Sequence, residues 1–225
     1  MKPVAAALWN RLFVVEILLF AAVFWADAAG YVPLSKTPFL LLIAWLSLRL
    51  RGLGWRSAGL TWPSGGARLL ALGLAAGVLF WALEYFVANP VLHHFTGKYP
   101  DLSDFRFIVG NEGMLALILL LNLVLAGFGE EMVWRGYALP RVAGLLGESR
   151  AAWLIAIIGV NVAFGLAHTY QGEPGVLQAA VQGVLLGLLY LFTGRNLIAP
   201  VAAHFSANTC DFVLIYLGRH LGLGA

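Results

Sequence analysis

The stretch MLALILLLNLVLAGFGEEMVWR, residues 114–135, decides the fold class of this chain. It is long enough to cross a bilayer as a helix, because about 20 apolar residues cover the hydrocarbon core. Near its end, however, it carries two adjacent carboxylates, Glu130 and Glu131, and then Arg135. A charge at the centre of a membrane helix costs about 3 kcal/mol on insertion scales unless it is paired or faces a wet cavity. The stretch therefore predicts a membrane helix with functional polar groups.

The composition of the whole chain supports a membrane environment. Of the 225 residues, 61% are hydrophobic and 11% are charged, and the mean hydropathy is +0.85. We predict an all-α protein, a polytopic transmembrane helix bundle of about seven spans in a single membrane domain, residues 1–225. The candidate spans, each of which is mostly apolar, are residues 9–29, 34–50, 67–89, 114–135, 151–169, 175–193 and 196–218.

The positive charges flank these apolar segments. Arginines 49, 51, 56 and 68 surround the second loop, and arginines 135, 141 and 150 surround the fourth. Lys and Arg accumulate on the cytoplasmic side of membrane proteins, so this pattern predicts a cytoplasmic N-terminus and a C-terminus on the other side. The chain has no basic polar segment interleaved with aromatic residues, so we expect the lipid bilayer and no nucleic acid as a partner.

Helical spacing separates the two adjacent glutamates. Each residue of an α-helix turns by about 100°, so Glu131 and Arg135, four residues apart, lie within about 40° of each other and can pair. Glu130 is rotated by about 100° from its neighbour and points at a different group. We therefore predict a structural partner for Arg135 in Glu131 and a different role for Glu130.

Two further polar groups follow helical spacing in later spans. NVAFGLAHTY, residues 161–170, places Phe164 and His168 on one face of the fifth span. PVAAHFSANTCDF, residues 200–212, places His204 and Asn208 on one face of the last span, with Asp211 about 20° from the histidine.

Glu130 and His168 are predicted to lie at a similar depth in the membrane. Glu130 and His168 lie equally far from the turn near Ser149, so an antiparallel hairpin would set them side by side. Each of these residues alone could equally serve helix packing.

Other polar residues are better explained as interhelical hydrogen-bonding groups or as part of a solvated loop. The expected interhelical hydrogen-bonding residues are Glu84, Asn122, Gln178 and Gln182. The expected loop residues are His93 and His94, in the polar segment 89–112.

Three short motifs resemble one family of membrane enzymes. EEMVWR (130–135) fits EExxxR, FGLAH (164–168) fits FxxxH, and HFSAN (204–208) fits HxxxN. Their order and approximate spacing are similar to those of the CPBP intramembrane proteases, also called Abi, which include the type II CAAX prenyl endopeptidases and bacteriocin-processing relatives. Each motif is weak alone, but three in order inside apolar helices are specific. The resemblance covers residues 114–212, which we take as the catalytic core, with residues 1–90 as accessory helices.

The resemblance implies hydrolysis of a peptide bond inside the membrane. Glu130 and His168 would activate water, while His204 and Asn208 would stabilise the oxyanion of the tetrahedral intermediate. Their supporting residues would be Glu131, Arg135, Phe164 and Asp211. Water is the expected nucleophile, since Ser206 lies about 160° from the Asn208 face and Cys210 has no base at helical spacing.

Three alternatives remain open from the sequence. Glu130, His168 and His204 form an O/N/N set that could hold zinc, although HExxH is absent and the resemblance implies a metal-independent glutamate protease without a cofactor. The same cavity could belong to a non-catalytic scaffold or immunity protein that binds a peptide or a sensor partner, but such a protein needs no general base. A transporter is disfavoured, because paired broken helices are missing.

The expected substrate is a membrane-associated peptide or protein, and the expected location is the inner (plasma) membrane of a bacterium. Nothing in the sequence indicates whether the substrate is prenylated.

Overall fold

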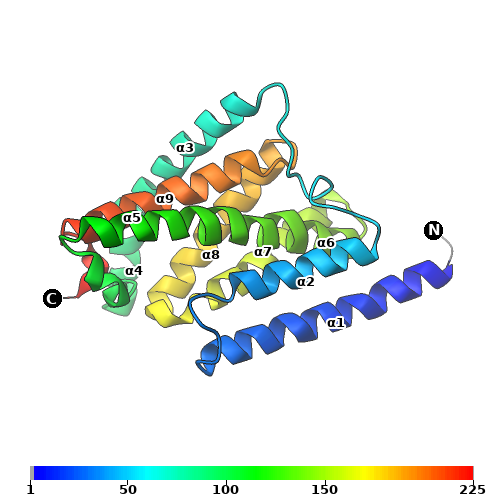
Figure 1. The fold of residues 1–225 in the computed structure, drawn as a ribbon, viewed down its shortest axis with the longest axis horizontal. Helices are drawn as coiled ribbons and strands as arrows, with labels where there is room; N and C mark the ends of the chain where they lie inside the picture. The colour runs from blue at the N-terminus through cyan, green and yellow to red at the C-terminus, as the bar shows by residue number, and fades with distance from the viewer. Residues whose placement is uncertain (1–2, 225) are drawn as a thin grey trace.

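The computed structural model describes residues 3–224, with side chains from residue 12 onward, and within that range the chain is helical with no strand. The all-α prediction is confirmed. The α-helices pack as a bundle (Figure 1): α1 (Pro3–Ala28), α2 (Thr37–Leu50), α3 (Gly66–Leu83), α4 (Asn89–Thr96), α5 (Glu112–Leu121), α6 (Leu139–Leu145), α7 (Arg150–Leu166), α8 (Gly172–Phe192) and α9 (Ile198–Tyr216).

Shorter helical segments connect them. Three have the wider π-helical hydrogen-bonding pattern: η1 (Glu84–Ala88), η3 (Asn122–Glu130) and η4 (Met132–Ala138). Three are 3₁₀ turns: η2 (Ser103–Ile108), η5 (Thr169–Gln171) and η6 (Leu221–Leu223).

Four continuous helical segments of the described chain are long and apolar enough to cross a membrane: Gly66–Thr96, Glu112–Leu145, Thr169–Phe192 and Ile198–Tyr216. They cover four of the seven predicted spans. The helices Thr37–Leu50 and Arg150–Leu166 are apolar but shorter, and α1 covers the first predicted span over 26 residues. The total of seven spans stays a prediction.

One predicted loop is wrong. His93 and His94 were expected in a solvated connection, but both lie on α4, which continues α3 and η1 in one segment of 31 residues. Pro90 does not interrupt it, because the π-helical turn η1 directly precedes α4, and a local π turn accommodates the missing N–H of a proline inside a membrane helix.

Small residues bring helices α3 and α9 into close contact. A Cβ added to Gly73 would lie 2.4 Å from the carbonyl oxygen of Ala199, and one added to Gly77 would lie 2.1 Å from that of Ala203. This is the small-xxx-small pattern of membrane helices, in which backbones approach where side chains are missing. The contact fixes the position of α9, the helix that carries His204 and Asn208.

Helix α1 is attached to the bundle through a buried carboxylate. Glu16 accepts hydrogen bonds from Ser47 Oγ (2.6 Å) on α2 and from Arg141 Nε (3.0 Å) on α6, and it is paired with the guanidinium of Arg51. Tyr137 Oη donates to Ser47 Oγ at 2.9 Å. A charge inside an apolar helix is thus offset by partners on neighbouring elements.

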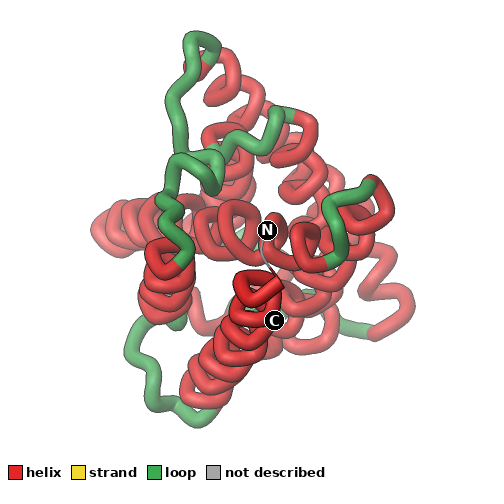
Figure 2. The backbone as a smooth tube through the Cα atoms, turned by 90° about the vertical axis from the view of Figure 1, so that its right-hand side faces the viewer, coloured by secondary structure: helices red, strands yellow, loops and turns green. Residues whose placement is uncertain are grey.

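The two ends of the bundle carry different loops. The segments between α1 and α2, between α4 and α5, and between α7 and α8 lie at the same end as the C-terminus, on the left of Figure 1. The loops after α2, α6 and α8 lie at the opposite end of the bundle, together with the N-terminus. This end faces the viewer in Figure 2, where many of the helices appear nearly end-on.

Candidate active site

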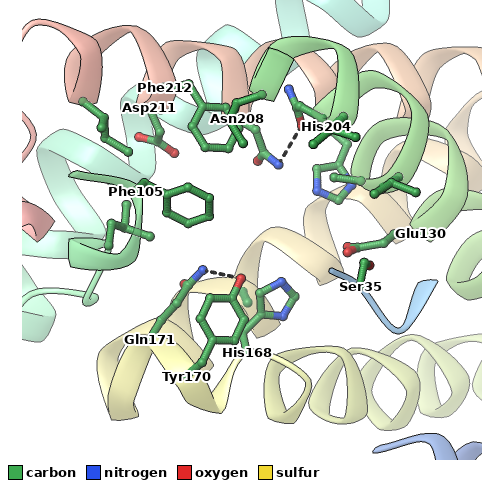
Figure 3. Close-up of a pocket in the computed structure, with 18 of the residues that line it drawn as sticks. Ser35, Phe105, Glu130, His168, Tyr170, Gln171, His204, Asn208, Asp211 and Phe212 are labelled. Carbon is green, nitrogen blue, oxygen red and sulfur yellow. Dashed lines mark hydrogen bonds between the residues drawn. The ribbon is translucent and has the colours of Figure 1, made fainter. Parts of the chain in front are cut away.

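The structure brings the four predicted catalytic residues to one cavity of about 350 Å³. Glu130 ends η3, His168 follows α7, and His204 and Asn208 lie one turn apart on α9. Figure 3 shows their side chains converging from these three parts of the fold. The sequence predicted this convergence, because each residue interrupts an apolar segment at a position that needs a polar partner or a cavity.

The EExxxR motif lies on π-helical backbone. Segments η3 and η4 flank Glu131, so the α-helix expected there is wrong in its hydrogen-bonding pattern. π-helical turns are rare and are frequent at functional sites. Glycines without side chains let the wider segment pack closely on its neighbours, since a Cβ on Gly129 would lie 2.6 Å from Thr37 Cγ2.

The predicted pair between Glu131 and Arg135 is present. Arg135 Nη1 donates to Glu131 Oε1 at 2.7 Å, and both side chains are almost completely buried. Arg135 Nη2 also donates to Asn161 Oδ1 (3.1 Å) and to the carbonyl oxygen of Gly183 (2.9 Å). The guanidinium lies 4.7 Å from the centre of the Phe164 ring. Sequence reasoning missed Asn161, whose only signal was a lone amide inside an apolar helix.

Glu131 has a second partner that helical spacing could not reveal. His204 Nδ1 lies 2.8 Å from Glu131 Oε1, the same oxygen that Arg135 binds. An ionised carboxylate only accepts hydrogen bonds, so Nδ1 carries the proton and Nε2 is the nitrogen left for the cavity. Neutral His204 therefore offers an acceptor at Nε2, and it donates from Nε2 only as the imidazolium.

His168 is oriented by the backbone. The sequence predicted a fifth span that runs to residue 169, but helix α7 ends at Leu166. His168 therefore lies just beyond the helix. Its Nδ1 still reaches the carbonyl oxygen of Phe164 at 2.8 Å. Because a carbonyl only accepts, the proton sits on Nδ1 and the Nε2 lone pair stays available. The Phe164 ring packs against both histidines, with centroids 4.8 Å from His168 and 6.2 Å from His204.

Unlike Glu131, which is completely buried and binds both Arg135 and His204 through Oε1, Glu130 lines the cavity. Its Oε2 is buried and has no hydrogen-bond partner in the part of the chain that the structure describes. Glu130 and His168 also line a second cavity of about 990 Å³ that reaches between the ends of α1 and α7. The predicted proximity of Glu130 and His168 is present, and together they offer a carboxylate oxygen and an imidazole lone pair.

Asn208 is positioned by a buried amide on the neighbouring segment. Asn208 Nδ2 donates to Asn122 Oδ1 at 3.1 Å, and Asn122 Nδ2 donates to the carbonyl oxygen of Phe205 at 3.1 Å. The amide of Asn208 has two N–H groups, so one remains for the cavity. Asn122 is the interhelical hydrogen-bonding residue that the sequence predicted.

Asp211 lies at the far end of the same cavity. Its Oδ1 accepts from Trp81 Nε1 (2.8 Å) and from His220 Nε2 (3.1 Å). Seven residues of α-helix span about 10 Å, so Asp211 shares the face of His204 but lies two turns away. It does not contact the group around Glu130.

Glu130, His168 and His204, the O/N/N set that the sequence offered for zinc, are not assembled as a metal-ligand group in the described structure. Among residues 3–224, no group of three or more His, Cys, Asp or Glu side chains is placed to hold a metal ion. The Nδ1 atoms of both histidines are engaged by oxygen atoms, an arrangement that metal-bound histidines share, so these hydrogen bonds do not exclude zinc. Glu130, His168 and His204 share a cavity without forming a ligand set, and no step below is assigned to zinc.

Residues 112–210 match the family model described as type II CAAX prenyl endopeptidase Rce1-like. This segment is therefore similar to the Rce1-like endopeptidases. The match confirms the resemblance to the CPBP proteases and covers all three motifs. It supports a CAAX-type intramembrane protease, and together with the apolar helices it shows an integral membrane protein.

A curated relative is the uncharacterised protein YybS of Bacillus subtilis (strain 168). The two are 32% identical over 114 residues, which is 51% of this chain and 34% of the relative. The chain thus spans about a third of the length of the relative that it matches. No solved structure matches the chain significantly.

Proposed function

We propose that this chain is an intramembrane endopeptidase that hydrolyses a peptide bond near the end of a membrane-associated peptide or protein. The observation that carries the proposal is the single cavity lined by Glu130, His168, His204 and Asn208. A scaffold that only binds a peptide would not need a buried carboxylate with an unengaged oxygen beside an oriented histidine.

In this mechanism, a water molecule between Glu130 and His168 attacks the carbonyl carbon of the scissile bond. Glu130 takes the proton from water as the carbon–oxygen bond forms, and His168 Nε2 accepts a hydrogen bond from the same water. The proton then passes to the amine as the carbon–nitrogen bond breaks. Water, rather than a side chain, is the nucleophile.

Asn208 and His204 act on the developing oxyanion. The second N–H of the Asn208 amide donates to it, and the amide is preorganised by its hydrogen bond to Asn122. His204 donates to the oxyanion from Nε2 in its imidazolium form, while Glu131 Oε1 fixes the orientation of the ring through Nδ1. Glu131 therefore serves both Arg135 and the proposed oxyanion site.

The direct test is cleavage by the purified chain. We expect the protein, reconstituted in liposomes with a library of membrane-anchored peptides, to release new peptide ends that mass spectrometry detects. Treatment with a zinc chelator should leave the rate unchanged, because the mechanism needs only protein side chains and water. Loss of activity on chelation, with recovery when zinc is returned, would reassign Glu130 and the two histidines as metal ligands.

We further propose a bacterial plasma membrane as the location and an orientation in which the cavity opens away from the cytoplasm. The cavity is lined at its mouth by residues from the loops at the C-terminal end of the bundle, such as Ser35, Leu102 and Gln171. That end is nearly balanced in charge, since its loops and helix termini carry five acidic and four basic residues: Asp27, Asp101, Asp104, Glu112 and Glu173, and Lys36, Lys98, Arg106 and Arg219.

The opposite end is strongly basic. Its loops and adjoining helix termini carry seven arginines: Arg49, Arg51, Arg56, Arg68, Arg141, Arg150 and Arg195. Arg135, which the sequence pattern counted among the arginines that surround the fourth loop, is buried and does not contribute. Basic residues in short loops set orientation, so this end faces the cytoplasm and the mouth of the cavity faces outward.

Single cysteines test this orientation. In a Cys210→Ser background, Ser103→Cys at the cavity end and Ser57→Cys at the basic end form a matched pair of exposed positions. A membrane-impermeant maleimide should label Ser103→Cys in intact cells and Ser57→Cys only after permeabilisation. The reverse pattern would place the cavity mouth on the cytoplasmic side.

A further inference from the structure

The cavity extends well beyond the proposed catalytic residues. From His204 it continues along α9 to Asp211, a distance of about 10 Å for seven helical residues. At that end it is lined by Phe105, Gln178 and Phe212 as well. Figure 3 shows the Asp211 carboxylate on the cavity side of α9, facing Phe105. The proposed mechanism does not use this end of the cavity.

Asp211 is held in one orientation. Both Trp81 Nε1 and His220 Nε2 donate to Oδ1, so this oxygen is fixed by two N–H groups from different parts of the fold. The other oxygen, Oδ2, receives neither bond. The side chain keeps one fifth of its surface exposed, so the carboxylate is accessible from the cavity.

The charge of Asp211 is not neutralised by its two partners. His220 Nδ1 accepts a hydrogen bond from the backbone N–H of Gly222 at 3.0 Å, so its single proton sits on Nε2 and the ring is neutral. The Trp81 indole is neutral as well. Among the described residues that line this cavity there are two carboxylates, Glu130 and Asp211, and no lysine or arginine.

A second carboxyl group lies behind this surface. Glu84 is 3% exposed, and its Oε1 has no hydrogen-bond partner in the described chain. It lies near Asp211, and its side chain is hydrogen-bonded to Gln178. The Asp211 carboxylate, in a cavity of low dielectric, favours a cation strongly and disfavours a second anion.

We propose that the Asp211 end of the cavity is a substrate subsite that takes a cationic group, the side chain of a lysine or arginine. The aromatic pair Phe105 and Phe212, with centroids 5.3 Å apart, offers an apolar surface for the aliphatic stem of such a side chain. Its charged end reaches Asp211 Oδ2. The proposal rests on the proposed function, since it assigns the substrate of that site.

The distance sets the position of the basic residue. Asp211 lies about 5 Å along the helix from Asn208 and about 10 Å from His204, and an extended peptide advances about 3.3 Å per residue, so the basic residue lies roughly two to three residues from the scissile bond. A subsite of this kind also rejects peptides with an acidic residue at that position, because two carboxylates would be placed together without a counter-charge.

Matched peptides test the subsite by binding and by cleavage. We would use membrane-anchored peptides that differ only by Lys, Gln or Glu at the positions two and three residues before or after the scissile bond. Binding is measured by fluorescence anisotropy to the Glu130→Gln protein, and cleavage is measured with the native chain. In one of these series, the Lys peptide should bind about tenfold more tightly than the Glu peptide, as expected for a close charge pair.

Asp211→Asn supplies the decisive comparison. It keeps an oxygen that can accept from Trp81 and His220 but removes the charge, so the preference for Lys over Glu should fall to about twofold or less. Asp104→Asn, an exposed change in the same end of the protein, should keep the full preference.

The outcomes separate this proposal from the protease assignment. A preference for Lys in binding that Asp211→Asn removes, without cleavage of any peptide, would support the subsite and reject the protease. Cleavage with no preference, or with a preference that Asp211→Asn leaves intact, would reject the subsite alone. Absence of both binding preference and cleavage would reject both.

Discussion

Glu130→Gln should lower the rate of peptide cleavage by about 100- to 10,000-fold, the usual contribution of a general base. Glutamine has nearly the same size and shape, but its amide cannot take the proton from water. The change should leave folding intact, because Glu130 Oε2 has no hydrogen-bond partner to lose among the described residues. Cleavage kinetics and thermal unfolding of the purified variant measure the two effects separately.

Glu112→Gln is the matched control for this prediction. Glu112 begins α5, in the same continuous helical segment, but it is exposed and does not line the cavity. The same chemical change there should preserve both activity and stability. Cleavage by Glu130→Gln at a rate close to that of the native chain would rule out Glu130 as the base.

Glu131→Gln should destabilise the fold by about 3–5 kcal/mol, because it leaves the buried guanidinium of Arg135 without a counter-charge. Arg135 is 1% exposed, so water cannot replace the lost partner. Arg135→Met alone should also destabilise, since it leaves the carboxylate of Glu131 unpaired except for His204. Denaturant or thermal unfolding in detergent measures these losses.

The double variant Glu131→Gln with Arg135→Met should recover much of that stability, because no unpaired charge then remains. Recovery is incomplete, since Asn161 and the carbonyl oxygen of Gly183 lose their donor. Arg150→Met, a change at an exposed arginine, should alter stability by about 0.5 kcal/mol or less.

Activity distinguishes the two glutamates further. Glu131→Gln should lower cleavage together with stability, because Glu131 also orients His204. If Glu131→Gln is fully stable but inactive while Glu130→Gln still cleaves, then the base and the structural partner have been assigned the wrong way round.

Relations within one helix could be predicted from the sequence. The pairing of Glu131 with Arg135 and the common face of His204 and Asn208 both follow from spacing, because a helix returns to the same face every three to four residues. The pairing survives the change from α to π geometry, since residues four apart remain neighbours in the wider turn. The apolar composition likewise determined the all-helical fold class.

Relations between helices were decided by the tertiary structure. Glu131 and His204 are 73 residues apart, and their contact at 2.8 Å depends on how closely α9 approaches η3 and η4. Likewise, Asp211 meets Trp81 only because glycines 73 and 77 let α3 pack directly on α9. Local periodicity specifies which face of a helix is polar, but the depth and rotation of its neighbour come from side-chain packing. The sequence alone therefore determined which residues need partners, and packing determined which partners they have.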